Sequence, residues 1–322
     1  MRLLNQTCEA LIQKYSDNTL EYINLMYQHI ERCGRTCYHS SDKITEDSAK
    51  PFVERMIKSN HTAMLEHGTI YLAITYNPEV VEERKHLSKY LANPYTEVIC
   101  KILESDSVPV SEQKIGESIR VTKSIAYITT NYRVIVENNL QDDLKYLCKP
   151  TEYHKKRYTL YCTTALHCYK DLTRHRKFSF AIESTRYCNY SKTEKFGDMA
   201  FIIPTWINLK EGQYFDGKYV TPLFKEFLKS DTYSKLVERF ILDLVGIERT
   251  YNEFIENGWQ AQQAAEILPQ CIKGDMIITG FESDWKHLID LRFYGTTGAP
   301  HPMVQELATL MKEELEKLGF NY

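Results

Sequence analysis

The sequence lacks the local signatures of several large classes of protein. No run of about eighteen apolar residues occurs, so no transmembrane helix is expected. Polar and charged residues follow the first positions too closely for a signal peptide. The phosphate-binding loop G-x-x-x-x-G-K-[ST], the dinucleotide motif G-x-G-x-x-G and the nucleophile elbow G-x-S-x-G are also missing. These absences argue against the most familiar nucleotide-binding folds and against a serine hydrolase.

An excess of positive charge is also lacking. The chain has 40 Lys and Arg against 43 Asp and Glu, a formal charge of −3. This balance argues against a protein that coats nucleic acid, although it does not exclude local basic patches. Nine cysteines are present without a C-x-x-C pair, which favours reduced thiols in a cytoplasmic setting. Because Cys33 and Cys37 stand near His39, a metal site is an alternative interpretation of this segment. No second ligand pair has zinc-finger spacing, so no metal is expected and structural thiols are favoured.

No internal repeat, low-complexity segment or Pro/Gly-rich linker divides the chain. The sequence therefore predicts one domain over residues 1–322, of mixed α/β (α+β) class, with a surface insertion around 84–124. Apolar spacing and end signals predict helices over 19–33, 45–60, 231–257, 261–267, 284–291 and 304–318. Strands are predicted within 68–76, 124–136 and 157–163.

The most informative segment is rich in cations and aromatic rings. Within thirteen positions stand Arg174, His175, Arg176, Lys177 and Arg186, interleaved with Phe178, Phe180 and Tyr187. A run of basic residues is more often a solvated face. Here apolar residues and the acidic Glu183 flank the run, and arginine matches phosphate oxygens bidentately, so a pocket for phosphorylated ligands is favoured.

Two histidines earlier in the chain are open to a different interpretation. His61 and His67 stand either side of Glu66 and could indicate a metal site, but the H-E-x-x-H order of metalloproteases is absent. Hydrogen bonding within the core is the favoured interpretation for these histidines.

Four blocks together resemble one known family. One block is similar to the R-H-R-x7-S signature of the flavin-dependent thymidylate synthases: it consists of Arg174-His175-Arg176, seven further residues and Ser184. The match continues to Tyr187. Residues 61–68, 131–134 and 285–292 are similar to further blocks of that family, in the same order.

The resemblance implies a flavin-dependent thymidylate synthase-like fold and a cytoplasmic homotetramer with active sites at subunit interfaces. Its activity would be methylation of dUMP to dTMP, with FAD as cofactor and with methylenetetrahydrofolate and NADPH as co-substrates; no membrane or nucleic-acid partner is expected. By matching positions, the implied flavin-binding residues are His61, Arg174, His175, Arg176, Lys177 and His287. The implied dUMP-binding residues are Asp171, Arg174, Glu183, Ser184, Thr185, Arg186 and Arg292. Arg292 is the implied catalytic residue, which activates the uracil.

The sequence departs from the family at two positions. Ala265 stands where an arginine usually precedes the Leu268-Pro269 element, and Phe281 stands where a flavin-contacting asparagine is usual. Two alternatives therefore stay open: a catalytically impaired relative that binds flavin or nucleotide, and a nucleic-acid-binding module.

Overall fold

The computed structural model describes residues 1–103, 123–216, 218–229 and 235–322. Two compact units make up the chain. The first comprises residues 1–11, 32–44 and 158–322, and the second comprises residues 12–31 and 45–157. The fold class is mixed α/β, as predicted. The assignment of one domain with an insertion stays a prediction, and residues 104–122 of that insertion lie outside the described residues.

The first unit contains two sheets. A four-stranded sheet has the order β2 (Thr7–Ala10), β6 (Arg157–Ala165), β10 (Lys273–Phe281) and β7 (Ser179–Ile182). A smaller sheet has the order β8 (Ala200–Ile202), β1 (Arg2–Leu4) and β9 (Gly212–Gln213). The helices are α5 (Leu166–Leu172), α6 (Thr193–Phe196), α7 (Pro222–Leu228), α8 (Lys235–Glu256), α9 (Ala261–Ala264), α10 (Glu282–Arg292) and α11 (Pro302–Lys317).

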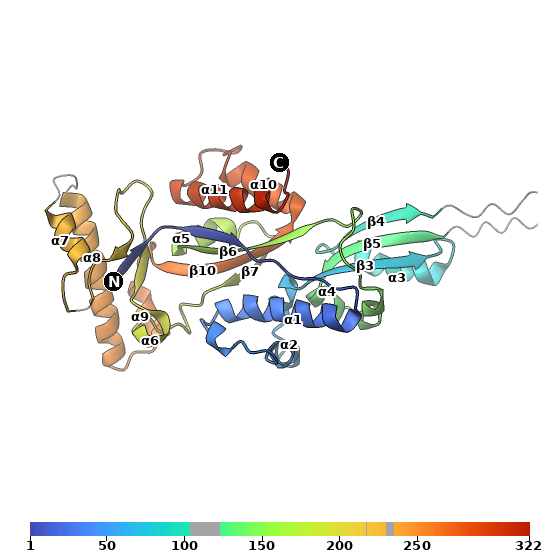
Figure 1. Ribbon diagram of the computed structural model, residues 1–322, viewed down its shortest axis with the longest axis horizontal. Helices are drawn as coiled ribbons and strands as arrows, with labels where there is room; N and C mark the ends of the chain where they lie inside the picture. The colour runs from blue at the N-terminus through green and yellow to red at the C-terminus, as the bar shows by residue number, and fades with distance from the viewer. Residues whose placement is uncertain (104–122, 217, 230–234) are drawn as a thin grey trace, which may run out of the picture. The chain divides into compact units, whose positions relative to one another are not determined.

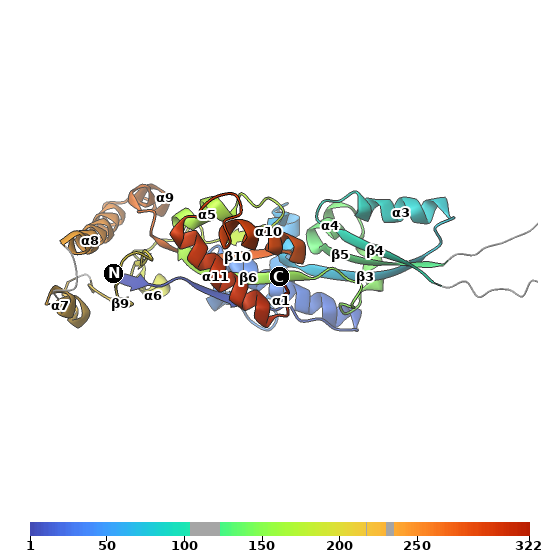
Figure 2. The same cartoon turned by 90° about the horizontal axis from the view of Figure 1, so that it is seen from above.

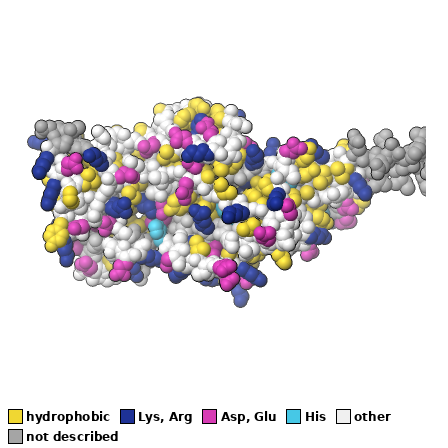
Figure 3. All heavy atoms as spheres, in the orientation of Figure 1, with side chains coloured by type: hydrophobic (Ala, Val, Ile, Leu, Met, Phe, Trp, Pro, Cys, Tyr) yellow, Lys and Arg dark blue, Asp and Glu magenta, His cyan; other side chains and the backbone are white. Residues whose placement is uncertain are grey.

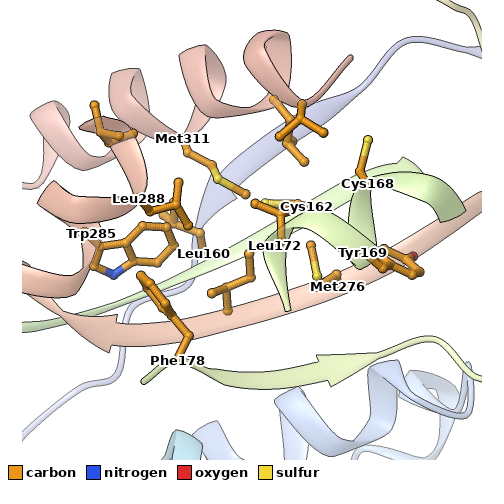
Figure 4. Packing of buried hydrophobic residues seen from close by; sticks show 14 of the residues in the cluster. Leu160, Cys162, Cys168, Tyr169, Leu172, Phe178, Met276, Trp285, Leu288 and Met311 are labelled. Carbon is orange, nitrogen blue, oxygen red and sulfur yellow. The ribbon is translucent and has the colours of Figure 1, made fainter. Parts of the chain in front are cut away.

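The helices α10 and α11 cover one face of the four-stranded sheet (Figure 1). Helix α11 begins where the His301 side chain accepts a hydrogen bond from the Met303 N–H, with Pro302 at the first helical position. Its apolar positions face the sheet and include Met311, which packs near Leu288 of α10 (Figure 4). Burial of this apolar stripe, rather than helix propensity, is what stabilises such helices.

One glycine allows a close approach inside this core. A Cβ at Gly280 would lie 2.4 Å from the ring of Phe178, so any larger residue would displace that ring. The Phe178 ring instead packs edge-on against Trp285, with ring centroids 4.7 Å apart (Figure 4). Strand β10 and helix α10 thereby determine where Phe178 lies.

The second unit is a three-stranded antiparallel sheet with helices. Its strand order is β3 (Thr69–Tyr76), β5 (Ser124–Asn131) and β4 (Glu97–Ile102), with β5 in the centre. Helix α3 (Val81–Leu91) connects β3 to β4 (Figure 2). The other helices are α1 (Thr19–Thr36), whose residues from Arg32 on belong to the first unit, α2 (Ala49–Lys58) and α4 (Tyr132–Glu137).

Most predicted elements are present, with two informative differences. The strand predicted through residue 136 ends at Asn131, because the Asn131 side chain accepts from the Val134 N–H and begins helix α4. Strand β10 was not predicted, although it is the most buried strand of its sheet. The long helix α8 ends as expected before Gly258, which has a φ of +89°. Among the described residues, no helix is both long and apolar enough to span a membrane.

Candidate functional site

A hollow of about 340 Å³ lies where the basic segment meets helix α10. Its lining residues are Arg174, His175, Arg176, Lys177, Phe178, Asp284, His287, Leu291 and Arg292. The structure therefore brings together the four basic residues at 174–177 with His287 and Arg292, which lie more than a hundred positions further along the chain. Phe178 and Leu291 add apolar surface, so the hollow combines cations with an apolar wall. We call it the first hollow.

Arg292 is held in a defined orientation at the edge of this hollow. Its Nε–H donates to Nε2 of His175 over 3.1 Å, and Nη2 donates to the backbone oxygen of Asp171 over 2.9 Å. The side chain is only 20% exposed, which excludes a freely solvated arginine. A guanidinium has five N–H donors, so these two bonds orient the group while leaving donors for a ligand.

His175 is a neutral acceptor in this arrangement. Burial, together with the nearby charge of Arg292, lowers the pKa of His175 to about 4. A neutral imidazole can accept the Arg292 hydrogen bond, whereas an imidazolium could not. The rings of His175 and His287 lie edge to face with centroids 5.8 Å apart, and both imidazoles line the hollow.

The remaining cations of the hollow are directed toward solvent. Within the part of the chain that the structure describes, neither Arg174 nor Arg176 has an ion-pair partner, and both are exposed. Lys177 lies 4.0 Å from Asp284, with its own side chain 73% exposed. Such cations are available to a diphosphate or another anionic ligand.

A second hollow of about 460 Å³ surrounds Arg186. It is lined by Thr185, Arg186, Gln262, Ala265 and Glu266. The Arg186 Nε–H donates to Oε1 of Gln262 over 3.0 Å, and its guanidinium lies 5.2 Å from the centre of the Tyr187 ring. We call this the second hollow. Ala265, at the position where the family usually has an arginine, lines the same hollow as Arg186.

A buried ionic cluster lies next to the Ser184–Arg186 segment. The Lys273 ammonium donates to Glu183 Oε2 over 3.1 Å and to Asp275 Oδ2 over 2.5 Å. His39 Nε2 lies 3.0 Å from the same Glu183 oxygen, and Tyr190 donates to its other oxygen. Three of these side chains (His39, Glu183 and Asp275) have ligand atoms close enough for a metal ion, but Lys273 supplies a positive charge between the carboxylates.

The charges in this ionic cluster stabilise one another. Burial by itself would raise the pKa of Glu183 and of Asp275, but the hydrogen bonds from His39 and the charge of Lys273 outweigh it and lower both. The hydrogen bonds to Asp275 and Glu183 raise the pKa of His39 to about 9. Lys273 is therefore bound to two carboxylates and is not a free cation that could replace the arginine absent at 265.

The two hollows lie at opposite ends of one strand pair. Strand β7 pairs antiparallel with β10, with Ile182 opposite Met276 and Ser179 opposite Thr279. The basic residues 174–177 precede β7 and Glu183 follows it, while β10 begins at Lys273 and leads directly into α10. At roughly 3.3 Å per residue, the three steps from Ser179 to Ile182 separate the two ends of β7 by about 10 Å.

Other predicted site residues line neither hollow. Asp171 lies in α5, where its backbone oxygen accepts from Arg292. Ser184 donates its N–H to the Cys37 oxygen, beside the buried Glu183. His61 is an exposed residue of the second unit, at the start of the 3-10 helix Thr62–His67. The buried His67 ends this helix.

Two sequence blocks of the second unit also meet. Arg133 Nη1 donates to Glu66 Oε1 over 2.5 Å, and its Nε donates to Glu137. The Tyr132 N–H donates to the Gly68 oxygen. The blocks 61–68 and 131–134 are therefore neighbours in space, although more than sixty residues separate them.

Several lining residues were missed in the sequence. Asp284 stands three positions before His287, so helical spacing could have placed it in the first hollow. Gln262 and Glu266 lie on the helical turns around Ala265 and line the second hollow. The ionic partners His39 and Asp275 carry no local signal, because they meet Glu183 only through the strand pairing and the end of α1.

These features define a mixed α/β protein with one cationic hollow, suited to anionic ligands, and a second, polar hollow that contains Arg186. The family model described as thymidylate synthase complementing protein matches residues 150–318, which include both hollows and, of the ionic cluster, Glu183, Lys273 and Asp275. The chain belongs to the thymidylate synthase complementing protein family.

Solved structures show weaker similarity. A UMP/dUMP methylase, PolB, from Streptomyces cacaoi, solved with 5-Br dUMP, is 14% identical, with 99% of this chain and 93% of that chain covered and a TM-score of 0.41. Thymidylate synthase X from Helicobacter pylori, solved with FAD and dUMP, is 14% identical, with 49% and 66% covered and a TM-score of 0.34. No curated protein matches the sequence.

The ionic cluster predicts a pH-dependent contribution to stability. Because the pKa of His39 is raised from 6.5 to about 9 in the folded protein, its protonation stabilises the fold fully below pH 6.5, and this stabilisation is lost as the pH rises through 9. The difference in free energy of unfolding between wild type and His39→Gln should be larger at about pH 6 than at about pH 10, measured by urea denaturation.

A matched control is His86→Gln, which removes an imidazole from a more exposed pair with Asp143 in the second unit. A His39→Gln difference that stays constant across this pH range would show that His39 is not a charged partner of the two carboxylates.

Proposed function

We propose that the protein methylates dUMP to dTMP, with FAD as cofactor, methylenetetrahydrofolate as carbon donor and NADPH as reductant. The observation that carries the proposal is the first hollow, in which the basic segment and the oriented Arg292 meet inside the region of the family match. We further propose a cytoplasmic homotetramer.

The residues of the first hollow fit a flavin dinucleotide. The partner-free Arg174 and Arg176 suit a diphosphate, and Phe178 and Leu291 offer the apolar surface that a ring system needs. His175, Lys177 and His287 supply further polar contacts. A bound flavin would supply the hydride that no side chain can provide. On the second unit, His61 is proposed as a further flavin contact.

The second hollow suits the phosphate of the nucleotide. Thr185 offers a hydroxyl and Arg186 a guanidinium, and a charge-assisted bond to phosphate is stronger than a neutral one. Ser184 precedes them in the segment anchored by the ionic cluster. The exchange of hydrogen bonds between Glu183 and Asp275 therefore positions the nucleotide-binding segment.

Arg292 has the geometry to stabilise negative charge on the pyrimidine. Its guanidinium is oriented before any ligand arrives, since His175 and the Asp171 oxygen accept two of its N–H groups. Preorganised donors stabilise developing charge without reorganisation at the moment of reaction. The low pKa of His175 preserves this arrangement at neutral pH, because the acceptor stays uncharged.

The separation of the hollows supports active sites that are shared between subunits. Within one chain the two hollows lie at opposite ends of β7, yet the reaction requires the pyrimidine and the flavin in contact. In a homotetramer the first hollow of one subunit can meet the second hollow of another. The volume of the first hollow, at the lower end of the range for ligand pockets, agrees with a site completed by a second chain.

Two alternative functions are less well supported. A nucleic-acid-binding module would need a continuous basic surface, but on the face drawn in Figure 3 Lys and Arg side chains are interspersed with Asp and Glu. A catalytically impaired relative is favoured only by Ala265 in the second hollow.

An activity assay distinguishes these possibilities. The purified protein should be yellow, with a flavin absorption spectrum, and should convert dUMP to dTMP when methylenetetrahydrofolate and NADPH are supplied. Flavin binding without turnover would identify an impaired relative, and absence of both flavin and turnover would contradict the proposal.

Replacement of Arg186 should weaken the binding of dUMP and leave the binding of flavin nearly unchanged. Arg186→Ala removes one charge-assisted contact, worth roughly 1.5–3 kcal/mol, and should weaken dUMP binding by about 10- to 100-fold. Flavin binding should stay nearly unchanged, since Arg186 does not line the first hollow. Calorimetric titration with each ligand measures both effects. Equal losses for both ligands would reject the assignment of the second hollow to the nucleotide.

Replacement of Arg292 should affect the chemical step. Arg292→Lys retains a positive charge but loses the planar fork, so we expect FAD and dUMP still to bind and kcat to fall by on the order of 10²–10³. Arg239→Lys is the matched control, because Arg239 is an exposed arginine of α8 paired with Asp243. A kcat of Arg292→Lys near that of wild type would remove Arg292 from the mechanism.

A further inference from the structure

Two cysteines face each other across neighbouring strands of the four-stranded sheet. Cys8 of β2 is directly opposite Cys162 of β6, and their sulfur atoms lie 3.3 Å apart. In the same register Leu11 is opposite Thr159 and donates its N–H to the Thr159 oxygen. Hydrogen-bonded and non-hydrogen-bonded pairs alternate along an antiparallel ladder, so Cys8 and Cys162 form a non-hydrogen-bonded pair.

This position suits a covalent bond between the two side chains. In a non-hydrogen-bonded pair the Cα atoms lie about 4.5 Å apart and the side chains are closest, which is within the Cα separation that disulfides adopt. Both thiols are on the face of the sheet that α10 and α11 cover, where Cys162 is labelled in Figure 4. Little backbone movement is therefore needed to join them.

The two thiols differ in access to solvent. Cys162 is fully buried, whereas Cys8 on the edge strand is partly exposed. Burial raises the pKa of the Cys162 thiol, and the adjacent Cys8 raises it further. A dissolved oxidant would therefore react first at Cys8, with Cys162 as the resolving thiol.

We propose that Cys8 and Cys162 are a redox modification site that forms a reversible intrachain disulfide with small-molecule disulfides of the glutathione type. The Cys8 thiolate attacks one sulfur of the small disulfide, forming a mixed disulfide and releasing one small thiolate, which takes up a proton. The Cys162 sulfur then attacks the Cys8 sulfur, gives its proton to solvent and displaces the second small thiol. The two cysteines lose two electrons, and one small disulfide becomes two thiols.

The bond would connect distant parts of the sequence. Cys8 and Cys162 are 154 positions apart, so the disulfide closes a long loop in the unfolded chain. Closing a long loop lowers the entropy of the unfolded state and stabilises the folded one. Oxidation should therefore raise the thermal stability of the protein without new contacts in the fold.

The test uses the full chain in glutathione buffers that range from reduced to oxidised. After denaturation and maleimide labelling, nine thiols should react in the reduced protein. In the oxidised protein seven should react, because the disulfide uses two. Peptide mass spectrometry should find Cys8 joined to Cys162. The Tm should rise by on the order of 5 °C on oxidation and return after addition of dithiothreitol.

Variants identify the cysteines involved. In Cys8→Ser, all eight remaining thiols should still react with maleimide after oxidation, and the Tm should not shift. In Cys162→Ala, oxidation should give at most a glutathione adduct on Cys8. Cys168→Ser is the matched control, since Cys168 is a buried cysteine of the same core, and it should still form the bond. Nine reactive thiols in the oxidised wild type, a stable Cys8 adduct in wild type, or a bond between Cys162 and Cys168 would each overturn the proposal.

Discussion

The antiparallel pairing of β7 with β10 is the constraint on which both hollows depend. Strand β7 is only four residues long, yet the basic segment precedes it and the Ser184–Arg186 segment follows it. Strand β10 supplies Lys273 and Asp275 at one end and continues into α10, with His287 and Arg292, at the other. A slip of one residue in this register would move every β7 side chain to the opposite face and separate the partners at both ends.

Each end of the strand pair is secured by different physical means. At the α10 end, apolar packing dominates: Gly280 admits the Phe178 ring, and Trp285 packs against it. At the other end, a buried ammonium is shared between the Glu183 and Asp275 carboxylates. Breaking a buried ion pair by removing one partner is costly because it leaves an uncompensated charge. The ionic cluster therefore makes the position of the Ser184–Arg186 segment depend on the protonation of a few side chains.

The local sequence was sufficient to predict many of the elements. Periodic apolar residues and end signals predicted α1, α8, α10 and α11. Two of the four family-like blocks, those that begin at Arg174 and at Trp285, identified segments that line the first hollow. It was insufficient for β10, because the buried run around Met276–Thr279 has no alternation and is too short to distinguish a strand from a helix. It also extended β5 into α4, since the β-branched residues of that segment favour strand while the Asn131 cap favours helix.

The sequence by itself therefore determined the fold class, the family-like blocks and the cationic character of residues 174–186. Only the tertiary structure decided that Arg292 is oriented by His175 and by the Asp171 backbone, that Lys273 is held by two carboxylates, and that Cys8 faces Cys162. The physical reason is the short distance along the chain over which local sequence signals act. Propensities, caps and periodicity act over a few residues, whereas these pairings join groups more than ninety positions apart in most cases and exist only once strand register and helix packing bring them together.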